Sequence, residues 1–81
     1  MNQDEIRAGT LAELRRIAPE LDEHDLDPAR LLREQVDLDS IDWLNFLIAL
    51  HERFAVEIPE SEYARLATLD QIVVYLASKR A

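Results

Sequence analysis

The chain contains one glycine and three prolines among its 81 residues. A β-sandwich or a β-barrel needs many turns, and glycine and proline are prominent among the residues that form them. Their scarcity leaves long uninterrupted segments in which apolar residues recur at helical spacing. The sequence therefore predicts an all-α fold, and its length is that of a single domain spanning residues 1–81.

Apolar spacing predicts a small bundle of three main helices plus a short one. The main helices are expected at residues 6–17, at residues 40–54 and after Thr68. The short helix is third in chain order and is expected at residues 59–66. Pro59 suits its first position, because an N-terminal helical residue needs no amide hydrogen.

A long loop is expected between the first two helices, from Pro19 to Leu38. It is rich in acids and contains one expected short turn near residues 29–33. Loops of this length are unusual in small domains and are often functional. The side chains expected to hold the loop on the core are Leu26, Leu31, Leu32 and Val36.

Capping residues mark the starts of two helices. Asp39 is a good N-cap, and Asp42 resembles the acidic member of a capping box. Thr68 is followed three residues later by Gln71, a true box partner. In the first helix, Gly9 is expected to weaken the helix by up to about 1 kcal/mol relative to alanine.

Composition narrows the range of functions. Seventeen acids and nine bases give a formal net charge of −8, which disfavours nucleic-acid binding. The acidity suits plain solubility or partners with basic docking patches. Without cysteine, disulfides, thiolate metal sites and cysteine nucleophiles are excluded. No segment predicts membrane insertion or a signal peptide, so we expect a cytoplasmic protein. We also expect the protein to be a monomer.

The second helix has two apolar faces. At 100° per residue, one sector about 100° wide forms a core stripe, and a second sector is turned well away from it. The core stripe consists of Trp43, Phe46, Leu47, Leu50 and Phe54, and the outer stripe of Ile41, Leu44 and Ile48. The outer stripe is flanked by Asn45 and Glu52, and Asp42 lies further round the helix. The stripe is either a partly exposed docking surface or a surface covered by the long loop.

Ser40 opens this helix, and its residue type raises the question of catalysis. A nucleophilic serine needs a base within hydrogen-bond reach, but His51 lies about 16 Å further along the helix. The Gly-x-Ser-x-Gly elbow is also absent. Asp42 and Ile48 occupy the positions where a calcium loop starting at Asp37 would need glycine and glutamate. We therefore expect neither an enzyme nor a metal site, and since Asp39 caps the helix, the Ser40 hydroxyl is free.

The segment "LDSIDWLNFLIALHERFAVEIPE" resembles the central part of acyl carrier proteins. The similarity continues through "SEYARLATLDQIVVYL" without a gap and covers nearly the whole chain. The resemblance implies that Ser40 carries 4'-phosphopantetheine through a phosphodiester, and that Asp39 positions the serine for the transferase. Residues at regular positions of the family are Phe54, Ile58, Pro59, Thr68 and Tyr75.

The resemblance also implies partner enzymes. These are a phosphopantetheinyl transferase and enzymes of the acyl ligase, acyltransferase or ketosynthase type. The docking residues would be Ile41, Asp42, Leu44, Asn45, Ile48 and Glu52. The candidates for a cleft that shelters an acyl chain are Trp43, Phe46 and Leu47, with ordinary core packing as the alternative for Trp43.

Several positions depart from the family pattern: Asp37, Ile41, Trp43, Asn45, His51 and Arg53. The last three replace acids that are frequent on the family's second helix, so the docking face is less acidic than in carriers of fatty acid synthesis. We interpret the chain as a specialised carrier. A peptidyl or aminoacyl carrier and a carrier-like module that is never modified are the alternatives. His51 is expected to be exposed, either as a pH sensor for docking or as a solvated side chain.

Overall fold

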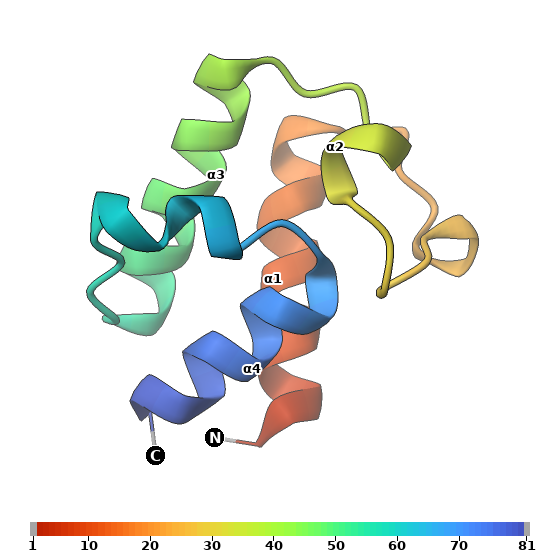
Figure 1. Cartoon of the computed structure of the whole chain (residues 1–81). Coiled ribbons are helices and arrows are strands. Elements are labelled where there is room, and N and C mark those ends of the chain that lie inside the picture. Colours follow the sequence, from red (N-terminus) through yellow and green to blue (C-terminus); the bar gives the residue numbers. More distant parts are fainter. Residues whose placement is uncertain (1, 81) are drawn as a thin grey trace.

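The computed structural model describes residues 2–80, which fold into a helical bundle (Figure 1). The α-helices are α1 (Gln3–Ile17), α2 (Leu32–Gln35), α3 (Ser40–Phe54) and α4 (Leu69–Arg80). Two 3₁₀ helices, η1 (Glu23–Asp25) and η2 (Glu60–Arg65), lie in the connections. Residues 2–80 contain no β-strand, so the predicted all-α class and the three main helices are confirmed.

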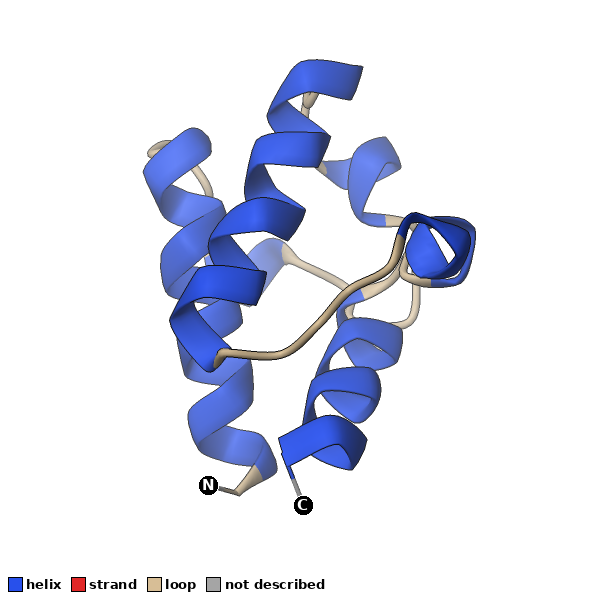
Figure 2. Cartoon of the chain, turned by 90° about the vertical axis from the view of Figure 1, so that its left-hand side faces the viewer, coloured by secondary structure: helices blue, strands red, loops and turns tan. Residues whose placement is uncertain are grey.

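Helix α1 is the centre of the arrangement, because it packs against both α3 and α4. Helix α3 runs alongside α1, and α4 crosses in front of the lower half of α1 in Figure 1. Turning the molecule shows the connection from α3 crossing toward η2 and α4 (Figure 2). The fully buried side chains that fill this space include Ile6, Leu14, Leu32, Phe46, Leu47, Leu50, Ile72 and Leu76.

Local side chains fix the starts of the helices. The predicted capping box of α4 is confirmed. The backbone amide of Gln71 donates to Thr68 Oγ1 at 3.1 Å, and the backbone amide of Thr68 donates to Gln71 Oε1 at 3.0 Å. The cap of α3 is confirmed too, since Asp39 Oδ1 accepts from the Asp42 amide at 2.8 Å. No hydrogen bond returns from the Asp39 amide to the Asp42 carboxylate within residues 2–80. Aspartate is one methylene shorter than the usual glutamate partner of a capping box.

The long loop is more structured than predicted. It holds two short helices, η1 and α2, and α2 begins at Leu32, three residues after the predicted turn begins. The reason is a turn at Asp27, whose carboxylate accepts from the Ala29 amide at 2.9 Å. The Gln35 side chain closes this turn by accepting from the Asp27 amide at 2.7 Å. These bonds keep residues 27–30 out of the helix.

The prediction that Leu31 helps to hold the loop on the core is wrong. Leu31 is 45% exposed, whereas the next residue, Leu32, is fully buried. Leu31 is the N-cap residue of α2, with φ of −60° and ψ of 125°, and it forms an isolated bridge with Thr68. The Leu32 backbone amide donates to the Ala67 carbonyl at 2.9 Å. The bridge holds Leu31 against the segment before α4, whereas Leu32 begins α2, and only Leu32 reaches the core.

Two other expectations need adjustment. Pro59 is the residue before η2 and not its first helical residue, and η2 is a 3₁₀ helix. Trp43 belongs to the core stripe but is only partly buried, as is Tyr75 of α4. The Tyr75 hydroxyl donates to the Glu57 carbonyl at 3.1 Å, which explains why this ring reaches the surface.

Gly9 has a packing role that its helix propensity does not reveal. A Cβ atom at this position would lie 2.7 Å from Phe54 Cζ and 2.8 Å from Arg53 Nε. Both side chains belong to the last turn of α3, so the absence of a Cβ lets α3 approach α1 closely. Glycine lowers the stability of the helix itself, but it permits this close contact between α1 and α3.

We predict that Gly9→Ala destabilises the protein although it improves helix propensity. The propensity gain is about 1 kcal/mol, whereas forcing a methyl group into a filled contact costs about 1–3 kcal/mol. Urea unfolding should show a net loss. The same substitution in a Phe54→Leu background removes the nearest aromatic atoms and should be less harmful. Stabilisation by Gly9→Ala in the native background would contradict the packing role.

Candidate functional site

Ser40 is the first residue of α3 and is exposed. The cap is Asp39, whose carboxylate accepts from the Asp42 amide, while the Asp39 carbonyl accepts from the Trp43 amide at 3.0 Å. The Ser40 hydroxyl forms no hydrogen bond with any residue that the structure describes. The serine is therefore not needed as a cap, and its hydroxyl is accessible for chemistry carried out by another protein.

The start of α3 provides a favourable environment for an anion. The first amides of a helix, here those of Ser40 and Ile41, have no carbonyl partner inside the helix. In a helix of 15 residues they lie at the positive end of the helix dipole. A phosphate ester on Ser40 would be placed at this end, so the local backbone fits a phosphodiester.

The outer stripe of α3 is exposed to solvent. Ile41, Leu44 and Ile48 are 70%, 44% and 42% exposed, so the alternative that the long loop covers them is wrong. Asn45 and Glu52 beside the stripe are also exposed. Three large apolar side chains therefore lie on one surface of the helix that begins with Ser40.

A hollow of about 490 Å³ lies next to the start of α3, with Leu38 and Trp43 in its wall; we call it the Trp43 hollow. Its lining residues are Leu31, Arg33, Glu34, Leu38, Trp43, Tyr63, Ala64, Leu66 and Ala67. Among the three cleft candidates, only Trp43 lies on this wall. Phe46 is fully buried behind it, with ring centroids 5.4 Å apart, and Leu47 borders a smaller hollow of about 130 Å³ beside His51.

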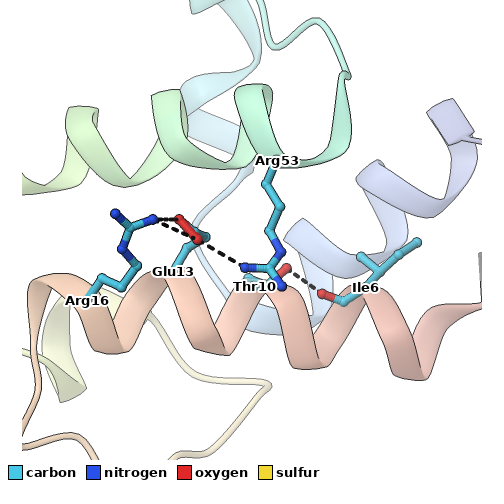
Figure 3. A network of polar contacts seen from close by, with 5 residues as sticks. All are labelled: Ile6, Thr10, Glu13, Arg16 and Arg53. Carbon is cyan, nitrogen blue, oxygen red and sulfur yellow. Dashed lines mark hydrogen bonds and ion pairs between the residues drawn. The ribbon is translucent and has the colours of Figure 1, made fainter.

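The sequence did not predict that α1 contains a buried carboxylate. Glu13 is only 5% exposed, and its carboxylate accepts from Arg16 Nη1 at 3.0 Å and from Arg53 Nη1 at 3.1 Å. Figure 3 shows Arg53 reaching from α3 toward α1 to make this contact. We call these three residues the Glu13 network; it borders a hollow between α1 and α3 that also touches Asn45 and Ile48.

The last turn of α3 is held by two side chains. Contrary to expectation, His51 is partly buried, and its Nδ1–H donates to the Val56 carbonyl at 2.7 Å. Arg80 of α4 donates from Nη1 to the Phe54 carbonyl at 3.1 Å. Ala55 follows in the left-handed region, with φ of 54°. His51 is thus a structural residue at the end of α3, and its ring is engaged by the backbone.

Within residues 2–80, no three His, Cys, Asp or Glu side chains gather as potential metal ligands. None of the described helices is long and apolar enough to cross a membrane.

Comparison with known proteins agrees with this geometry. Residues 9–76 match the family described as "Phosphopantetheine attachment site". Proteins named acyl carrier protein from Renibacterium salmoninarum, Thermosynechococcus vestitus and Acidothermus cellulolyticus are 34%, 31% and 30% identical to this chain. These matches cover 99%, 100% and 96% of this chain and 98%, 99% and 92% of the relatives. The chain belongs to the acyl carrier protein family, whose covalent prosthetic group is 4'-phosphopantetheine.

The capping geometry leads to a prediction for Asp39. Asp39→Ala removes the acceptor for the Asp42 amide and should lower the free energy of unfolding by about 1 kcal/mol. Asp39→Asn keeps an acceptor in the same place and should leave stability close to that of the native protein. Thermal and urea unfolding of both variants measure this difference. Equal losses in the two variants would show that the carboxylate charge, and not the cap, stabilises the start of α3.

Proposed function

We propose that this protein carries acyl groups on a 4'-phosphopantetheine arm attached to Ser40, and that it is not itself an enzyme. When bound, the group supplies a thiol that holds acyl groups as thioesters. The observation that carries the proposal is the exposed Ser40 hydroxyl at the start of α3, in a chain of the acyl carrier protein family. Because Asp39 caps the helix, modification of Ser40 would leave the cap intact.

The surfaces around Ser40 suggest roles for neighbouring residues. Asp39 would orient the start of α3 toward a phosphopantetheinyl transferase. Later partners, of the acyl ligase, acyltransferase or ketosynthase type, would contact the outer stripe together with Asp42, Asn45 and Glu52. The Trp43 hollow would shelter part of the acyl chain. A cytoplasmic, monomeric state stays a prediction.

We further propose that the protein is a specialised carrier. Its outer stripe is apolar, and Asn45 and His51 stand where the family often has acids. Arg53, the third such position, is paired with buried Glu13 and offers no negative charge to a partner. Partner enzymes that recognise carriers through basic patches would therefore meet fewer acidic side chains on this protein and bind it less well.

Intact-protein mass spectrometry tests attachment directly. We expect incubation with coenzyme A, magnesium and a broad-specificity phosphopantetheinyl transferase to add one phosphopantetheine mass. Ser40→Ala should abolish the gain because it removes the acceptor oxygen. Ser61 is exposed in η2, so Ser61→Ala is a matched control that should still be modified.

Each outcome separates the candidate functions. A mass gain that requires Ser40 supports a carrier, and loading with acyl or aminoacyl groups by the matching ligases then distinguishes acyl from peptidyl carriers. No gain with several transferases would reject the carrier proposal and favour an unmodified docking module that acts through the outer stripe.

The specialised role predicts poor use by general fatty acid synthase enzymes. With the same acyl group loaded, we expect kcat/KM for elongation to be at least about tenfold below that of a housekeeping carrier, a difference of about 1.4 kcal/mol. Asn45→Glu restores an exposed acid beside the outer stripe and should recover part of the loss. Asn45→Gln is the uncharged control. Equal elongation of the native protein and the housekeeping carrier would refute the specialised role.

A further inference from the structure

The surroundings of Ser40 pose an electrostatic problem for a phosphorylated arm. Asp37, Asp39 and Asp42 all lie within three residues of the serine, and the whole chain has a formal net charge of −8. A phosphodiester on Ser40 adds one more negative charge to this group. Like charges at short range repel one another. A nearby cation would reduce this repulsion and so favour the modified state.

Arg33 is a cation held close to this position. Its Nη2 donates to the Leu38 carbonyl at 3.4 Å, and Leu38 is two residues before Ser40. Arg33 and Leu38 also line the Trp43 hollow together with Trp43, three residues after the serine. The guanidinium is therefore placed at the segment that leads into α3, on the wall of the Trp43 hollow.

Arg33 differs from most arginines of the described chain. Arg7, Arg15, Arg16, Arg53 and Arg65 each form an ion pair with a carboxylate. Arg33 has no carboxylate within ion-pair distance in residues 2–80, and its one side-chain hydrogen bond there is to a backbone carbonyl. A guanidinium has five N–H donors, so most of them are available for another acceptor.

We propose that Arg33 binds the phosphate of the phosphopantetheine arm on Ser40. This inference rests on the proposed attachment at Ser40. A guanidinium matches the oxygens of a phosphate with paired N–H donors, which a single ammonium does not. The free amides at the start of α3 approach the same phosphate from the helix side. Arg33 and α3 together would hold the phosphate at the edge of the Trp43 hollow, so that the arm starts from a fixed position beside it.

The direct test is nuclear magnetic resonance of the apo and holo proteins. In protein labelled with ¹⁵N, the Nε–Hε signal of Arg33 should shift on modification, and the signal of Arg30 should not. The ³¹P signal of the holo protein should move in Arg33→Gln and return toward its native position in Arg33→Lys. Arg30 is the matched control, because it is exposed in the same loop and its side chain has no carboxylate partner among the described residues.

A thermodynamic cycle gives a second readout. Arg33→Gln should lower Tm of the holo protein by about 2–5 °C more than Tm of the apo protein, since only the holo form contains the phosphate. The excess should shrink at about 1 M salt, where charges are screened within about 3 Å. Arg30→Gln should change both forms equally.

The outcomes distinguish this inference from the proposal on which it rests. Absence of a mass gain on Ser40 overturns both. A holo protein whose Arg33 and ³¹P signals are insensitive to modification and substitution, with equal Tm changes in the two forms, overturns the role of Arg33 alone.

Discussion

Helix α3 is apolar on two faces, and α1 covers one of them. The close approach at Gly9, where a Cβ would collide with Phe54, fixes which face turns inward. Burial of the core stripe then leaves the outer stripe in solvent and sets the direction in which Ser40 emerges. A small chain has no further layer with which to cover the second face, so the same packing that builds the core also leaves the outer stripe exposed.

The α1–α3 interface also contains the least expected polar feature of the molecule. Glu13 is buried there, and a buried carboxylate is tolerated only when its charge is compensated. Arg16 and Arg53 provide that compensation, and Arg53 ties the last part of α3 to α1. Such pairs contribute more reliably to specific orientation than to net stability. The Glu13 network therefore fits a role in fixing the rotation of α3, which decides where the outer stripe points.

Local chemistry made much of the fold predictable. Asp39 and the pair Thr68–Gln71 mark helix starts through bonds that span three residues, and helical spacing separated the two faces of α3. The features that escaped prediction depend on partners distant in sequence. Glu13 and Arg53 are 40 residues apart, and the need for Gly9 arises only from α3. Leu31 illustrates a third case, because it is exposed where an isolated bridge joins it to Thr68, 37 residues further along a helical chain.

The direction of α3 relative to the chain ends has a practical consequence. The first turn of α1, the last turn of α4 and the last turn of α3 lie at one end of the molecule, while α3 begins at the opposite end (Figures 1 and 2). Ser40 is therefore at the pole remote from both outer helical turns. Immobilising the protein through a tag beyond α1 or α4 would leave the serine facing solution. Surface-based binding measurements with large partner enzymes are thus feasible in either orientation of the tag.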